Sequence, residues 1–163
     1  MKRGLFIGRF QPFHLGHLKD IQDALKEVNE LAIGVGSSNE QDTKNNPFSA
    51  KEREEMIKKA LQNKGIMNYT VFYIPDFHDD EKWMDYIEKN TPKFDVAYTG
   101  NEWTERCFKA RGYKVKRVNM LENISSTIIR DRIINNKNWQ ELVPKEAADF
   151  IFKIKGIERV KKI

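Results

Sequence analysis

Short apolar runs alternate with longer amphipathic segments along the whole chain, and this alternation constrains the fold more than any other feature. The apolar runs predict five strands, at residues 5–7, 31–35, 69–74, 95–98 and 113–118. The segments between them place apolar residues at helical spacing. Strand–helix alternation is typical of βαβ units, so we expect an α/β fold with a doubly wound, parallel five-stranded sheet and helices on both faces.

The expected helices follow from apolar spacing and from start and stop signals. Ser49 and Glu52 form a capping-box pattern that starts one helix, and Pro92 marks where another has already ended. A last helical stretch covers 139–154 and leaves a basic tail. The expected helices span 16–28, 49–63, 83–91, 101–111, 125–135 and 139–154. We expect one domain over 1–163, with a C-terminal helical extension from about residue 136.

Composition narrows the class of protein. An apolar fraction of 39% is enough for a packed core and excludes disorder as the main state. The single Cys107 cannot form an internal disulfide, which favours a reducing, cytoplasmic location. No apolar run approaches the roughly 20 residues that span a bilayer, so we expect no membrane association. A net charge of +5 suits an anionic ligand, and it is spread along the chain in a way that does not indicate nucleic acid.

Parallel sheets bind ligands at the carboxyl ends of their strands. We therefore expect the site in the loops that start at Gly8, Gly36, Pro75, Thr99 and Asn119.

The first of these loops is the most informative, because it sets His14 and His17 three residues apart at the entry of a helix. Both imidazoles can face one point, Gly16 lets a ligand approach the backbone, and the helix N-terminus favours an anion. The loop is neither a Walker A loop nor a dinucleotide fingerprint. A phosphate chain fits this loop. The alternative is a histidine pair that only caps the helix or lies on a polar surface.

A second segment, Ile124 to Arg130, has three hydroxyl side chains at a predicted helix start and an arginine one turn later. The hydroxyls, the helix N-terminus and the guanidinium can converge on the same anion. The alternative is that Ser125 or Ser126 only caps the helix and Arg130 lies on a solvated face.

The two segments carry a resemblance to a known group of enzymes. His14-Leu15-Gly16-His17 matches the HxGH signature, and residues 124–130 match the ISSTxxR signature, of the HxGH nucleotidyltransferase superfamily. Within it, the chain most resembles the archaeal type of nicotinamide-mononucleotide adenylyltransferases, through residues 8–17 and 46–53. That family usually has Thr-Ala-Gly-Glu-Arg where this chain has Ser49 to Arg53, a mild departure.

The resemblance implies a Rossmann-like sheet and the condensation of ATP with nicotinamide mononucleotide (NMN) to give NAD and pyrophosphate. It implies direct attack by the mononucleotide phosphate, without a covalent enzyme intermediate. Mg²⁺ would be held mainly by substrate phosphates and water, with no metal ligand from the protein. A homo-oligomer is also implied, with a hexamer as the suggested form.

The resemblance further assigns site residues. His14, His17 and Arg130 are the expected catalytic residues, with His17 nearest the transferring group. Arg9 and Arg130 would stabilise the β and γ phosphates and the leaving pyrophosphate. The full set expected to bind ATP is Gly8, Arg9, Phe10, Gly16, Arg53, Ile124, Ser126 and Thr127.

The acceptor pocket is expected after the third and fourth strands, with Asp76, Trp83 and Asn101 as NMN-binding residues. The Trp83 indole could stack on the pyridinium ring, or it could pack in the core with its own helix. Asn101 could reach a ribose hydroxyl or the carboxamide, or only cap a helix. We interpret Asp76, Asp79 and Asp80 as loop and cap residues in preference to metal ligands.

Other functions remain as alternatives. Phosphopantetheine and FMN adenylyltransferases share the ATP half of the site and differ in the acceptor pocket. An aminoacyl-tRNA synthetase needs more than 163 residues. A small RNA-binding protein has no use for the two motifs together, and this sequence lacks the exposed aromatic platform that single-strand binders need.

Overall fold

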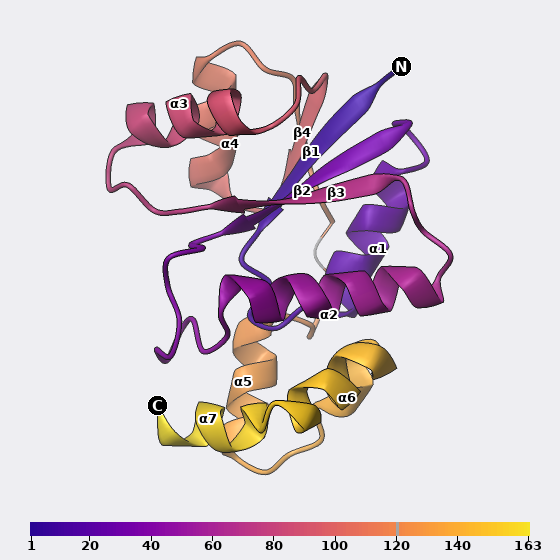
Figure 1. The fold of residues 1–163 in the computed structure, drawn as a ribbon, viewed down its shortest axis with the longest axis vertical. Coiled ribbons are helices and arrows are strands. Elements are labelled where there is room, and N and C mark those ends of the chain that lie inside the picture. The colour runs from indigo at the N-terminus through magenta and orange to yellow at the C-terminus, as the bar shows by residue number, and fades with distance from the viewer. Residues whose placement is uncertain (120) are drawn as a thin grey trace.

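Five parallel strands form one sheet at the centre of the protein (Figure 1), in the order β3-β2-β1-β4-β5. The computed structural model describes residues 1–119 and 121–163. The strands are β1 (Arg3–Gly8), β2 (Glu30–Gly36), β3 (Tyr69–Ile74), β4 (Val96–Thr99) and β5 (Val115–Arg117). All four pairings are parallel, so the predicted doubly wound α/β sheet is confirmed.

Successive residues of the central strands face opposite sides of the sheet and build two separate cores. Phe6 and Ile33 belong to the core on one side, beneath α1 (Leu15–Ala24) and α2 (Ala50–Asn63). Leu5 and Ala32 belong to the core on the other side, beneath α3 (Asp80–Asn90) and α4 (Glu102–Ala110). Figure 1 shows these helix pairs on opposite faces of the sheet.

The first five predicted helices agree with the structure to within one residue at both limits, except at the start of α3 and the end of α1. Ser49 and Glu52 form the predicted capping box at the start of α2. Helix α1 ends at Ala24, whereas the apolar spacing predicted a helix to Val28. Val28 is buried in the connection that leads to β2, so its apolar character reflects the core and not a longer helix.

The C-terminal region differs most from expectation. The single helix predicted over 139–154 is broken into a 3₁₀ turn (Gln140–Leu142) and α6 (Lys145–Lys153), because Pro144 lies between them and cannot continue a helix. The expected basic tail instead forms α7 (Gly156–Lys162). Helices α6, α7 and α5 (Ser126–Ile134) contribute buried residues to the same core as α1 and α2.

Arg159 of α7 connects the C-terminal helix to α2. It donates to both carboxylate oxygens of Glu52, at 2.6 and 2.9 Å, and Glu52 belongs to the capping box of α2.

In residues 1–119 and 121–163, every helix is too short or too polar to cross a membrane.

Candidate active site

A cavity of about 260 Å³ lies at the carboxyl ends of β1, β4 and β5. Strand order reverses between β1 and β4, the position where doubly wound sheets bind ligands. All the residues predicted for catalysis and ATP binding line it except Arg53, together with Asn101 of the predicted acceptor site. Two of the five predicted loops, those starting at Gly36 and Pro75, do not line it.

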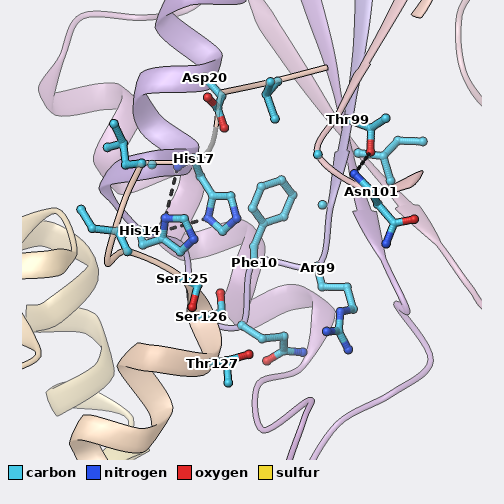
Figure 2. A pocket seen from close by; sticks show the side chains of 18 of the residues that line it. Arg9, Phe10, His14, His17, Asp20, Thr99, Asn101, Ser125, Ser126 and Thr127 are labelled. Carbon is cyan, nitrogen blue, oxygen red and sulfur yellow. Dashed lines mark hydrogen bonds between the residues drawn. The ribbon is translucent and has the colours of Figure 1, made fainter. Parts of the chain in front are cut away.

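His14 and His17 form a reciprocal cap at the start of α1 (Figure 2). The His17 backbone N–H donates to His14 Nδ1 at 3.3 Å, and the His14 N–H donates to His17 Nδ1 at 3.2 Å. The rings stack with centroids 3.5 Å apart. His17 also stacks on Phe13 and meets the edge of Phe10. The two histidines therefore cap the helix, as the alternative interpretation expected, and they also line the cavity.

Burial determines the charge of this pair. Burial lowers the pKa of His14 to about 4, and burial together with His14 lowers the pKa of His17 well below its usual value. Both rings are therefore neutral at neutral pH. Because each Nδ1 accepts a hydrogen bond, the ring proton lies on Nε2. The pair thus presents two neutral N–H donors.

Gly16 is required by the histidines themselves. A Cβ atom there would lie 2.9 Å from Cε1 of His14, closer than packing allows. The sequence suggested that Gly16 gives a ligand access to the backbone. In the structure it also gives the His14 ring the space to stack.

The start of α5 docks on the first loop. Ser125 caps the helix by accepting from the Ile128 N–H at 3.1 Å. Ser126 Oγ donates to the Pro12 carbonyl at 2.9 Å. Arg130 is 6% exposed and donates to the Gln11 carbonyl at 2.8 Å, so it does not lie on a solvated face. The two signature segments are thereby joined at one cavity.

Arg53 lies outside the cavity and is fully buried. Its guanidinium donates to the carbonyls of Arg9, Gly36 and Ser37 at 2.9, 2.7 and 3.1 Å. Burial and the charge of Arg9 lower its pKa to about 10, so it stays charged at neutral pH. The structure gives Arg53 a positioning contact between the loops after β1 and β2, where the sequence suggested contact with ATP.

The predicted acceptor residues are not gathered at one point. Asn101 lines the cavity and also caps α4, its side chain accepting from the Thr104 N–H at 3.0 Å. Asp76 lies outside the cavity and accepts from Ser37 Oγ at 3.1 Å. Trp83 is 4% exposed and its ring contacts those of Trp103 and Phe108. Trp83 thus has the core packing of its alternative interpretation, and its stacking role stays a prediction.

Sequence reasoning assigned no role to two polar residues that line the cavity, Gln11 and Asp20. Gln11 is 1% exposed, and its side-chain amide donates to the Phe48 carbonyl and accepts from the Phe48 N–H, both at 2.9 Å. Asp20 is 9% exposed and lines the cavity one turn after His17. Helical spacing from Gly16 and His17 could have indicated Asp20, whereas no local signal marks Gln11.

Comparisons with known proteins agree with this geometry. The profile of the cytidylyltransferase-like family matches residues 5–132. A nicotinamide-nucleotide adenylyltransferase of Thermococcus sibiricus is 45% identical over 98% of this chain and 88% of its own length. One of Saccharolobus solfataricus is 46% identical over 100% of this chain and 97% of its own length.

Solved structures show the same fold. A bifunctional NMN adenylyltransferase/ADP ribose pyrophosphatase of Francisella tularensis has a TM-score of 0.83 and 26% identity, covering 99% of this chain. This chain spans 51% of that bifunctional chain. A second structure of such a protein, complexed with AMP and a manganese ion, has a TM-score of 0.80 and 24% identity over 99% of this chain and 52% of that one. The profile match and the near-full-length relatives place this chain in the cytidylyltransferase-like family, among the nicotinamide-nucleotide adenylyltransferases.

Proposed function

We propose that the protein transfers the adenylyl group of ATP to nicotinamide mononucleotide, forming NAD and pyrophosphate. The observation that carries this proposal is the convergence of two neutral imidazole N–H donors, the Arg130 guanidinium and the hydroxyls of α5 on one cavity at the switch point of the sheet. The names of the full-length relatives support the choice of acceptor.

The residues act by positioning and by offsetting charge. The mononucleotide phosphate is already a nucleophile, so the reaction needs alignment with the α-phosphorus and needs no general base. His14 and His17 donate through Nε2 to phosphate oxygens on which charge develops. Arg130, held by the Gln11 carbonyl, and Arg9 stabilise the β and γ phosphates and the departing pyrophosphate. Ser126 and Thr127 add donors at the start of α5.

The side chains of the cavity fit phosphate better than they fit a divalent cation. Asp20 is the one carboxylate among the described residues that line the cavity, and its other ionisable members are arginines and neutral histidines. Mg²⁺ would therefore enter with ATP, held by phosphate oxygens and water. When bound, it offsets phosphate charge during transfer.

A direct assay tests the proposed reaction. The protein is incubated with ATP, Mg²⁺ and one acceptor at a time, and pyrophosphate and the dinucleotide product are measured. We expect NAD from nicotinamide mononucleotide and little product from phosphopantetheine or FMN. Pyrophosphate release with phosphopantetheine or FMN but not with the mononucleotide would keep the ATP half of the proposal and refute its acceptor.

We also propose that the chain assembles as a homo-oligomer, with a hexamer as the expected form, and that it works in the cytoplasm, where the buried Cys107 stays a free thiol. Sedimentation equilibrium measures the first property. A mass equal to that of one chain would contradict it.

A further inference from the structure

The Asp20 carboxyl group has no partner within the described part of the protein. It is 9% exposed, and no hydrogen bond joins it to any residue of 1–119 or 121–163. Asp23, further along α1, is by contrast half-exposed and bonded to Lys19 at 2.7 Å and Lys26 at 3.3 Å. Because Asp20 lines the cavity and the described residues offer its carboxyl group no hydrogen bond, that group is available to a ligand that enters the cavity.

Asp20 faces the cavity at a particular end of it. Gly16, His17 and Asp20 lie on one face of α1, with Asp20 one turn farther from the helix start. Figure 2 shows Asp20 at one end of the pocket and Ser126 and Thr127 at the other, with His17 between them. A nucleotide with its phosphates at the histidines and α5 would extend its nucleoside toward Asp20.

We propose that Asp20 is a specificity residue for the adenylyl donor, whose carboxyl group pairs with the base edge where an amino group stands beside an unprotonated ring nitrogen, as N6 and N1 do in adenine. This inference rests on the proposed function, because it places a nucleoside triphosphate in the cavity. The apolar side chains of Ile7, Val118 and Leu121 in the same lining suit the face of a base better than a sugar hydroxyl.

The protonation state of Asp20 suits this pairing. Burial raises the pKa of Asp20 to about 7, with Asp23 adding to the rise and Lys19 opposing it. Across the cavity the charged groups are Arg9 and Arg130, and the described lining residues between β5 and α5 contribute apolar side chains and a hydroxyl. Below its pKa of about 7 the carboxyl group is mostly protonated, and it then offers one donor for the ring nitrogen and one acceptor for the amino group.

Titration calorimetry of Mg-ATP between about pH 6 and about pH 9 tests the pairing in the wild-type protein, Asp20→Asn and Asp23→Asn. The side-chain amide in Asp20→Asn keeps a donor and an acceptor at every pH. Because ATP itself titrates in the same way in both measurements, its titration cancels in the ratio of the wild-type affinity to the Asp20→Asn affinity. As pH rises through the pKa of Asp20, we expect the affinity of the wild-type protein for Mg-ATP to fall at least about fivefold relative to that of Asp20→Asn. About fivefold is the lower limit expected when a base contact made of two hydrogen bonds is lost. Asp23→Asn, with the same charge change outside the cavity, should show the same fall as the wild type, at a somewhat lower pH because Asp23 contributes to the raised pKa of Asp20. A pH-independent ratio would overturn the proposal.

Base analogues supply a second arm. Purine riboside triphosphate lacks the amino group, so wild-type protein should bind it about fivefold or more weakly than ATP, and Asp20→Leu should lose most of that preference. If Asp20→Leu instead changes only the preference for ATP over 2′-deoxy-ATP, the carboxyl group contacts the ribose and the proposal is wrong. If Asp20→Leu does not fold, the pH arm decides. Failure of the proposed function is seen separately, as wild-type protein that forms no pyrophosphate from ATP with any acceptor.

Discussion

The imidazoles of His14 and His17 cap the same helix through each other's backbone, with ring centroids 3.5 Å apart and an interplanar angle of 18°. This arrangement uses both Nδ1 atoms as acceptors and leaves both Nε2–H groups as donors. Two stacked rings at that distance cannot both be cationic without strong repulsion, in agreement with the lowered pKa of each. The fold thus holds the pair in the neutral, donating form that phosphate contact requires.

The same burial makes the protein sensitive to acid. The pKa of His14 is about 4 in the folded state and near about 6.5 in the unfolded state, so the unfolded state binds more protons between these values. The free energy of unfolding therefore falls as pH decreases through this window, by up to about 1.4 kcal/mol per pH unit from this group. Urea unfolding at a series of pH values measures it.

His14→Asn is the matched variant, because asparagine also caps helices and does not titrate. The stability difference between wild type and His14→Asn should shrink as pH decreases below about 6.5. The raised pKa of Asp20 has the opposite effect on the free energy of unfolding, because the folded state holds this proton to higher pH than the unfolded state does. Asp20 is present in both proteins, so its effect cancels in the difference between them. A difference that stays constant with pH would show that His14 titrates normally.

His17→Ala is expected to lower kcat by about 10²–10³, the loss typical of removing one preorganised donor. The reason is the position of its Nε2–H beside the transferring phosphate in the proposed reaction. Steady-state kinetics measure the effect, and a thermal melt checks that the loss of packing against Phe13 has not unfolded the protein. A folded variant with near wild-type kcat would exclude this role.

Arg130→Lys is expected to weaken ATP binding or kcat clearly, although it keeps the charge. Arg130 donates to the Gln11 carbonyl and toward Thr127 from two different nitrogens, a fork that an ammonium group does not reproduce. Arg132→Lys is the control, because Arg132 lies on the same helix, outside the cavity, and bonds to Glu141. Equal kinetics for the two variants would show that the fork has no role.

Arg53→Met is expected to destabilise the protein by at least about 1–3 kcal/mol, the cost of one buried carbonyl left without a donor. Three loop carbonyls lose their donor at 3.1 Å or less in this variant. Denaturant unfolding measures the loss, with Lys58→Met on the exposed face of the same helix as control. If Arg53→Met keeps its stability and loses only ATP affinity, Arg53 contacts ATP directly, as the resemblance implied.

Trp83→Ala tests the stacking prediction against core packing. Loss of a buried tryptophan costs about 3–5 kcal/mol of stability. Stacking on the nicotinamide ring would add a selective two- to thirtyfold weakening of nicotinamide mononucleotide, about 0.5–2 kcal/mol, with ATP binding unchanged and with partial recovery in Trp83→Phe. Calorimetric titration of both ligands measures this. Phe108→Leu, a change in the ring that packs against Trp83, controls for lost stability alone, and equal weakening of both ligands in Trp83→Ala would rule out stacking.

Much of the fold and half of the site could be predicted from local sequence. Strand Tyr69–Ile74 has the predicted limits, and the capping box of Ser49 and Glu52 formed as expected, because strand alternation and capping act over a few neighbouring residues. The end of α1 and the C-terminal region were less predictable. Apolar spacing predicted a helix at Val28 because this residue is buried, and a buried residue in a turn continues the apolar spacing just as a helical residue does. Local sequence predicted a tail for the basic C-terminal segment because it does not show that Arg159 bonds to Glu52, a residue far away in the chain.

By itself, therefore, the sequence determined the parallel α/β sheet and the two motifs whose loops meet at its edge, since both follow from spacing along the chain. Only the tertiary structure decided how the site is held and charged. Arg130 contacts a carbonyl 119 residues away and Arg53 one 44 residues away, and no local pattern encodes such contacts. The neutral state of the histidines, the burial of Trp83 and the raised pKa of Asp20 likewise depend on desolvation, which exists only after distant elements have packed together.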